Sequence, residues 1–232
     1  MDKRILCLFW NIQSKQERAV VEIFEHNPDL VFLAEVENPQ RGNVDSLMKD
    51  RGYQCIKWVG DKETKGLACY AKPEIVDESS YCNEGKYCIS VKLKDRKESI
   101  VGVWTIKEGS IGYIEQMKRI FDHYIDKETC PIFIGDFNVS AAVQDQGKKA
   151  IALFDSFDEK GYGSLYHLKN DVAIGQEKDV THLHTSKKYF MLDYILCPKM
   201  IADSLAMKAS FEDAVIWLKE GHSDHIPIML QI

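Results

Sequence analysis

IFIGDFNVS, residues 132–140, is the stretch that decides how this chain folds. The run from Ile132 to Gly135 is apolar or small, and it leads directly into Asp136 and Asn138. A short apolar run bounded by polar residues is typical of a strand buried on both faces. A carboxylate at such a position is costly unless it is paired or bound to a metal. We therefore expect Asp136 to end a buried strand and to have a chemical task.

The same arrangement recurs outward along the chain. Polar residues stand at the ends of other apolar runs: Asn11 after ILCLFW (5–10), Glu35 in LVFLAEV (30–36), Asp193 in YFMLDYILC (189–197), and Asp224 with His225 before IPIML (226–230). Strand ends are where α/β folds place ligands and catalytic groups. The pattern predicts one site assembled from several strands.

Strands and helices both occur in each half of the chain. Predicted strands cover 5–10, 30–36, 53–60, 66–72, 87–93, 99–106, 132–135, 190–197 and 226–232. One predicted helix is capped by Ser14 and a short one ends at Gly52. Two others have Tyr124 and Phe154, respectively, on their apolar faces. Residues 161–188 are expected to form a polar loop. The run of strands between 53 and 106 has no helices within it, which argues against a doubly wound parallel sheet. We predict a single α/β domain over residues 1–232, with two packed sheets and helices outside.

Composition limits the class of protein. The chain has 232 residues, of which 45% are hydrophobic and 10% aromatic, which excludes disorder as the main state. Its net charge of −6 excludes a protein that coats nucleic acid through bulk positive charge. No apolar run is long enough for a membrane span, and Ile5 to Trp10 is too short for a signal sequence. Seven cysteines without a CxxC pair make a cysteine zinc site unexpected. We expect a cytoplasmic, monomeric protein without disulfides.

The strand-end residues share a chemistry. The hard oxygen ligands that Mg²⁺ or Mn²⁺ prefers are present as Asn11, Glu35, Asp136, Asn138 and Asp224. Carboxylates brought together from distant strands repel one another unless a cation lies between them. His225, next to Asp224, is suited to act as an acid, a base or a phosphate donor. Asp193 would hold the tautomer of that histidine from behind.

Six segments together carry a family resemblance. They are LFWNIQ (8–13), LVFLAEVEN (30–38), GLACYAK (66–72), IFIGDFNVS (132–140), MLDYIL (191–196) and GHSDHIPI (221–228). In this order, and over nearly the whole chain, they resemble the endonuclease/exonuclease/phosphatase superfamily, which includes exonuclease III-like and deoxyribonuclease I-like enzymes. The resemblance implies a four-layered α/β sandwich, with two mixed sheets packed together, and a metal-dependent phosphoesterase.

The matching motifs also imply roles for individual residues. Asn11 and Glu35 would bind the metal, and Asp224 would assist either the metal or the attacking water. Asp136 would orient or deprotonate the attacking water, with Asn138 beside the phosphate or that water. His225 would bind the scissile phosphate, and Asp193 would support it.

Substrate contacts are less clearly marked, because the sequence departs from the family there. The segment VGVWTIKEG (101–109) has no histidine where many members have one, so Trp104 and Lys107 are the candidates in its place. His184 and Tyr70 are further candidates, with a core position as the alternative for Tyr70. His182, His184 and His222 are either zinc ligands or part of a polar loop wall.

These observations predict a hydrolase that uses Mg²⁺ or Mn²⁺ to cleave phosphodiesters. We expect a nuclease, either an endonuclease or an exonuclease, with DNA or RNA as its partner. One alternative is a phosphatase or phosphodiesterase acting on a small phosphoester such as a nucleotide or phosphoinositide. Another is a catalytically impaired binding protein. The short 139–190 segment lacks the aromatic-rich stretch of abasic-site endonucleases, which argues against a role in DNA repair.

Overall fold

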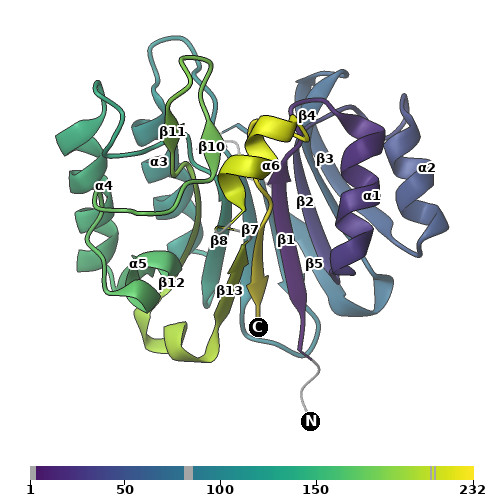
Figure 1. Ribbon diagram of the computed structural model, residues 1–232. Coiled ribbons are helices and arrows are strands. Elements are labelled where there is room, and N and C mark those ends of the chain that lie inside the picture. The colour runs from purple at the N-terminus through teal and green to yellow at the C-terminus, as the bar shows by residue number, and fades with distance from the viewer. Residues whose placement is uncertain (1–3, 81–85, 210, 212) are drawn as a thin grey trace.

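Two mixed sheets of six strands each form the centre of the computed structural model, which describes residues 4–80, 86–209, 211 and 213–232 (Figure 1). The first sheet has the order β13-β14-β1-β2-β4-β3. Its strands are β1 Leu6–Asn11, β2 Leu30–Val36, β3 Gln54–Lys62, β4 Lys65–Ala71, β13 Ala206–Ala209 and β14 Ile228–Gln231. The second sheet has the order β5-β6-β7-β8-β12-β9. Its strands are β5 Val76–Ser80, β6 Cys88–Leu93, β7 Ser99–Trp104, β8 Pro131–Asp136, β9 Tyr162–Ser164 and β12 Asp193–Pro198.

Helices cover the outer face of each sheet (Figure 1). On the first sheet these are α1 Gln16–His26 and α2 Asn43–Asp50, and on the second α3 Tyr113–Ile125, α4 Gly147–Glu159 and α5 Leu165–Asn170. A hairpin of β10 His182–Leu183 and β11 Tyr189–Phe190 and the helix α6 Ala214–Glu220 lie at one end of the sandwich. Two 3₁₀ turns, Pro73–Ile75 and Lys199–Ser204, precede β5 and β13. No described helix is long and apolar enough to cross a membrane.

Apolar residues explain this layering. A central cluster between the sheets includes Phe9 and Phe32 from the first sheet and Ile100 and Ile134 from the second. Two further clusters lie under the helices on the two outer faces. At the centre, Gly102 leaves room for Phe32, because a Cβ on Gly102 would lie 2.1 Å from the Phe32 ring. The arrangement confirms the predicted four-layered α/β sandwich.

Several short elements were not anticipated. Edge strands β5 and β13, and the β9–α5 unit within the presumed loop 161–188, are present. Cys7, Cys69, Cys88 and Cys197 are buried, as expected.

Strand direction determines where the predicted site residues meet. β1 runs parallel to β2, and β7 runs parallel to β8, so the carboxyl ends of each pair lie together. β12 runs antiparallel to β8, which places Asp193 opposite Asp136 in register. The first residue of β12 therefore meets the last residue of β8 at the same end of the sandwich.

Candidate active site

Asp136 lies at the centre of the predicted site and is 1% exposed. Its Oδ1 accepts a hydrogen bond from the backbone N–H of Asn138 at 3.0 Å. Its Oδ2 accepts hydrogen bonds from Asn138 Nδ2 at 3.0 Å and from Asn11 Nδ2 at 3.1 Å. Such bonds stabilise a buried carboxylate in its ionised form and fix its orientation. The structure thus brings Asn11 from the first sheet to Asp136 and Asn138 of the second.

His225 lies between two carboxylates. Its Nδ1 is 2.8 Å from Asp193 Oδ2, and its Nε2 is 3.7 Å from Asp136 Oδ2. The backbone around it is also fixed: Ser223 Oγ donates to the carbonyl of Asn11 at 2.6 Å and accepts from the N–H of His225 at 3.1 Å. Trp10 Nε1 donates to the carbonyl of His225 at 2.8 Å. The imidazole is held with Nε2 facing Asp136, as the sequence predicted for a histidine supported by Asp193.

Electrostatic interactions favour a protonated His225 beside an ionised Asp136. Burial disfavours the imidazolium, but the charges of Asp193, Asp136 and Asp224 outweigh it and raise the pKa of His225 to about 10. Burial raises the pKa of Asp136 to about 7, while the charge of His225 lowers it. Asp136 accepts hydrogen bonds from three donors, which favour its anion, so the imidazolium with an ionised Asp136 is the favoured state of the pair.

Glu35 and Asp224 form a second acidic group beside this pair. Glu35 Oε2 is 2.7 Å from Lys65 Nζ, and Glu35 Oε1 is 3.5 Å from Asn11 Nδ2. Burial raises the pKa of Asp224, and the charge of Glu35 raises it further. Gln13 Nε2 donates to Asp224 Oδ2 at 2.9 Å. Among the residues that the structure describes, the four carboxylates of the two groups face two cationic side chains, Lys65 and His225. The site therefore carries an excess of negative charge.

Two site residues have left-handed backbone conformations. Glu35 has φ 61° and Asn138 has φ 51°. Asparagine adopts this region readily, but glutamate does so only where the surrounding structure enforces it. The pairing of β2 with β4 shifts register between Ala34 and Val36, so Glu35 is the bulged residue. The bulge takes Glu35 out of the strand alternation and turns it towards the site.

Thr181 fixes the position of Asp193. Its Oγ1 accepts hydrogen bonds from the backbone N–H groups of Leu192 at 3.0 Å and Asp193 at 3.1 Å. Its carbonyl accepts from the N–H of Ile226 at 2.9 Å. Thr181 is fully buried and joins the start of β12 to the segment that carries His225. Sequence reasoning did not select it, because a threonine in a polar stretch has no distinctive signal.

The residues predicted to contact the substrate lie in different surroundings from one another. Tyr70 is fully buried in the outer cluster of the first sheet, so it is a core residue and the expectation of a substrate contact was wrong. Trp104 pairs with Asp136 in register but is 5% exposed and packs on Tyr87 at 4.8 Å. Lys107 is exposed, with Nζ 5.4 Å from the Tyr113 ring centre.

The histidines of the hairpin region have different surroundings. His184 is exposed, and its Nδ1 lies 2.8 Å from Ser186 Oγ. His222 faces Glu22 and Glu220 at 3.0 and 3.1 Å, so it does not join His182 and His184 in a zinc site. His182 is 8% exposed, and its ring centre is 4.5 Å from that of His225. Burial, with the charge of His225, lowers the pKa of His182 to about 3, so its imidazole is neutral.

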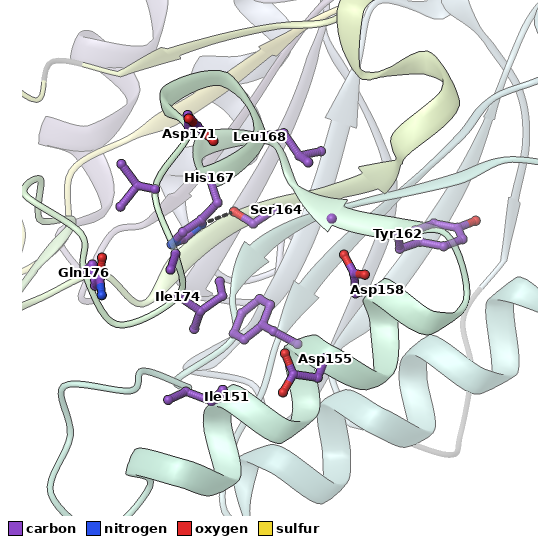
Figure 2. Close-up of a pocket in the computed structure, with 14 residues that line it drawn as sticks. Ile151, Asp155, Asp158, Tyr162, Ser164, His167, Leu168, Asp171, Ile174 and Gln176 are labelled. Atoms are coloured by element: carbon purple, nitrogen blue, oxygen red, sulfur yellow. Dashed lines mark hydrogen bonds between the residues drawn. The ribbon is translucent and has the colours of Figure 1, made fainter.

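A separate concavity of about 660 Å³ lies beside α4 and α5, and none of the predicted site residues lines it (Figure 2). Ser164 and His167 lie on its wall, with Ser164 Oγ 2.8 Å from His167 Nδ1. His167 Nε2 is 3.0 Å from Glu177 Oε1. This network attaches the segment after α5 to the second sheet, and that segment continues to Thr181. It therefore supports the active site from a distance.

Comparisons with known proteins identify the architecture. No protein-family model and no curated protein sequence matches the chain. The 3′ phosphatase NExo from Neisseria, bound to a product DNA hairpin, matches with a TM-score of 0.74 and 15% identity over 97% of this chain and 98% of that one. An AP endonuclease from Archaeoglobus fulgidus gives 0.75 and 17% over 97% and 98%. The endonuclease domain of a telomere-specific non-LTR retrotransposon gives 0.64 and 17% over 99% and 98%.

The likeness extends over nearly the full length of both chains in each case, although few residues are identical. The sequence resemblance is confirmed at the level of the fold. The chain therefore has the fold of the endonuclease/exonuclease/phosphatase superfamily.

Proposed function

We propose that this protein is a divalent-metal-dependent phosphodiester hydrolase that acts on nucleic acid. The observation that carries the proposal is the buried contact between Asp136, Asn11 and His225, which joins polar groups from both sheets around one point. Burying several carboxylates together is costly, so such a cluster in a protein usually serves a function. The similar solved structures include a 3′-5′ exonuclease, an AP endonuclease and a 3′ phosphatase bound to a product DNA hairpin, which supports nucleic acid as the substrate.

The residues of the acidic group fit a divalent cation. Glu35, Asn11 and Asp224 would hold it, since they offer the oxygen donors that Mg²⁺ and Mn²⁺ prefer. Glu35 Oε2 already attracts a cation, the ammonium of Lys65. The excess negative charge of the site is what a bound divalent ion would neutralise. When bound, such an ion supplies Lewis-acid polarisation of the phosphoryl oxygen and stabilisation of the leaving oxygen.

Asp136 is placed to orient the attacking water. Its carboxylate is held by Asn11 and by both nitrogens of Asn138, so it meets a water in one fixed orientation. Asn138 Nδ2 also donates to the carbonyl of Thr105 at 3.0 Å, which locks the amide itself. Fixed groups of this kind need no reorganisation during the reaction, which is the main source of their catalytic effect.

His225 is placed to neutralise charge on the phosphorus oxygens. The raised pKa keeps its imidazole protonated near neutral pH, and Nε2 is the nitrogen that Asp193 leaves available. Asp193 holds Nδ1 and stabilises the cation, as a carboxylate behind a catalytic histidine does. The pair therefore presents a fixed positive donor beside Asp136.

The surface around the site also suits a nucleic acid. The β10–β11 hairpin stands at the same end as α6 and carries exposed His184, Lys187 and Lys188 (Figure 1). It is attached to the site, because the N–H of Leu183 donates to the carbonyl of Asp224 at 2.8 Å. Lysines on a site rim attract a phosphate backbone even when the net charge of the protein is negative. We propose that exposed Lys107 contributes to the same surface, whereas Trp104 is buried beneath it, and that the protein acts as a monomer in the cytoplasm.

Hydrolysis assays on the purified protein test this function. A panel of duplex DNA with a recessed end, DNA with a 3′-phosphate, single-stranded RNA and bis(p-nitrophenyl) phosphate is incubated with Mg²⁺, with Mn²⁺ and with EDTA. We expect cleavage of nucleic acid with metal and none with EDTA. Asp136→Asn and His225→Ala should each lower kcat by about 10²–10⁴-fold. Exposed Asp171→Asn is the control and should retain full activity.

The outcomes separate the alternatives. Cleavage that persists in EDTA or in Asp136→Asn contradicts the proposed mechanism. Activity confined to the small phosphoester would assign a phosphatase or phosphodiesterase instead of a nuclease. A protein that binds DNA but hydrolyses none of the panel would be the catalytically impaired form.

A further inference from the structure

His182 is the unusual residue of the active-site wall. It is 8% exposed, yet neither ring nitrogen has a hydrogen-bond partner among the described residues. Nδ1 is buried without a partner, and Nε2 lies 3.9 Å from Asp224 Oδ2, too far for a hydrogen bond. Buried polar groups without partners are rare and call for an explanation. An imidazole nitrogen that faces a carboxylate at this distance without bonding to it has the arrangement of a metal ligand without its metal.

The backbone brings His182 and His225 together. The two residues form an isolated antiparallel bridge, flanked by hydrogen bonds from Leu183 N to Asp224 O and from Ile226 N to Thr181 O. Residues directly opposite each other in such a bridge project their side chains to the same side at close range. The ring centres are accordingly 4.5 Å apart. The approach of the two imidazoles is thus fixed by the fold and is independent of flexible side-chain positions.

Three ligand atoms are close enough for one ion. One ligand atom from each of His182, Asp224 and His225 lies within 4.8 Å of the other two. Tetrahedral zinc, with bonds of about 2.0–2.1 Å, places its ligands about 3.4 Å apart. The 3.9 Å between His182 Nε2 and Asp224 Oδ2 needs only a small side-chain rotation to reach that spacing.

The groups around His225 and Asp224 fit a transition-metal site. A metal-bound histidine usually donates its other N–H to a carboxylate, which fixes the ring. His225 has this partner in Asp193, 2.8 Å from Nδ1, which leaves Nε2 for an ion. Asp224 likewise has an orienting partner, Gln13 Nε2 at 2.9 Å. Two imidazoles and one carboxylate favour Zn²⁺ over Mg²⁺, because Mg²⁺ prefers oxygen ligands alone.

We propose that His182, Asp224 and His225 form a zinc-class site, separate from the oxygen site of Glu35 and Asn11 but sharing Asp224 with it. An ion held there displaces the proton from Nε2 of His225 into solvent and takes this atom, which would otherwise face the phosphate. Zinc binding therefore inhibits Mg²⁺-supported hydrolysis. The inhibitory effect rests on the proposed function, but the binding site does not.

Metal binding is measured first, without substrate. The EDTA-treated, dialysed protein is titrated with Zn²⁺ by calorimetry and with Co²⁺ by visible absorption, both in excess Mg²⁺ to occupy the oxygen site. We expect one zinc-class site in the wild type. His182→Phe keeps a ring and removes the ligand, and should weaken zinc binding by about 100-fold or more, since even losing an outer partner costs 10–100-fold. His184→Phe, two residues away, should leave zinc affinity unchanged. Circular dichroism confirms that both variants fold.

Inhibition is measured second, with Zn²⁺ added to the Mg²⁺-supported reaction. The half-inhibitory Zn²⁺ concentration of His182→Phe should rise at least about tenfold above that of the wild type. Wild-type zinc affinity in His182→Phe overturns the site, as does an equal loss in His184→Phe. If His182→Phe raises KM for the nucleic acid but binds zinc normally, the ring is a substrate donor and the metal site is wrong. Failure of all hydrolysis would contradict the proposed function, while the calorimetry would still decide the zinc site.

Discussion

His225 Nδ1 lies 2.8 Å from Asp193 Oδ2, and this contact joins the two sheets of the sandwich at the active site. Asp193 begins β12 of the second sheet, whereas His225 lies in the segment that leads into β14 of the first. Both residues are at most 4% exposed. The orientation of the histidine therefore depends on how the sheets are packed together.

Replacing Asp193 by Asn tests this contact. The amide removes the negative charge that stabilises the imidazolium and no longer fixes the tautomer, so kcat should fall by about 10²–10⁴-fold. KM should change little, because Asp193 lies behind His225 and does not face the substrate. Steady-state kinetics on the best nucleic acid substrate give both constants. Near-wild-type kcat in a folded Asp193→Asn variant would show that the contact is only structural.

Thr181→Val tests how Asp193 is held. Valine keeps the shape but removes the oxygen that accepts from Leu192 N and Asp193 N, leaving two buried N–H groups unpaired. At about 1–3 kcal/mol for each unsatisfied group, the free energy of unfolding should fall by about 2–6 kcal/mol. Urea denaturation measures the loss, and kcat should fall with it. Thr181→Ser keeps the hydroxyl and should retain most of the stability and most of kcat. If Thr181→Ser and Thr181→Val lose equal amounts of stability, the hydrogen bonds to the oxygen are not the cause.

Glu177 is expected to make the stability of the protein depend on pH in the acidic range. Burial opposes its charge, but hydrogen bonds from His167 and from the N–H of Gly175 outweigh burial and lower the pKa of Glu177 below its usual value of 4.5. An ionised group with a lowered pKa stabilises the fold above its unfolded pKa, and this contribution is lost as pH falls through the folded value. Glu177→Gln should therefore be less stable than the wild type at neutral pH, with the difference shrinking below about pH 4.5. Urea denaturation across that pH range measures it, with exposed Glu159→Gln as the control. A difference that does not change with pH would exclude the charge as its cause.

Gly102 tests the packing between the sheets. A methyl group there would meet the Phe32 ring at 2.1 Å, deep in the central cluster. Gly102→Ala should lower the free energy of unfolding by about 1–3 kcal/mol, because a close-packed core accommodates an extra carbon only by strain. Gly112→Ala, where nothing lies within 4 Å, should change stability by no more than about 1 kcal/mol. Thermal unfolding of the two variants compares them directly, and equal stability would mean that Phe32 moves aside without cost.

The strands that carry the site could be predicted because their apolar runs are interrupted by single polar residues. Asn11, Asp136 and Asp193 stand out in this way, and the structure brings them within contact of one another or of His225. β5 (VDESS) and β13 (AMKA) could not be predicted, since short, polar or small edge strands have no apolar run. Edge strands need pairing on one side only, so little in their own sequence marks them.

The sequence also could not show which of two neighbouring histidines, His182 or His184, faces His225. His182 and His184 have the same spacing as two residues on one face of a strand. β10 ends at Leu183, so His184 lies in the turn and His182 faces His225. Tyr70 was ambiguous for a related reason: β4 lies between β2 and β3, and helices cover the face on which Tyr70 packs. Tertiary position, and not local pattern, determined both outcomes.

The position of β14 has a consequence for how the protein is made. β14 is the last strand of the chain, yet it lies between β13 and β1, and it pairs with the first strand from Leu6↔Gln231 to Phe9↔Ile228. Because synthesis proceeds from the N-terminus, β1 has no antiparallel neighbour until residues 228–231 have left the ribosome. Ser223 and His225 cannot dock on Asn11 and Trp10 before then. The candidate active site is therefore completed only after β14 has been synthesised, later than the other strands that carry it.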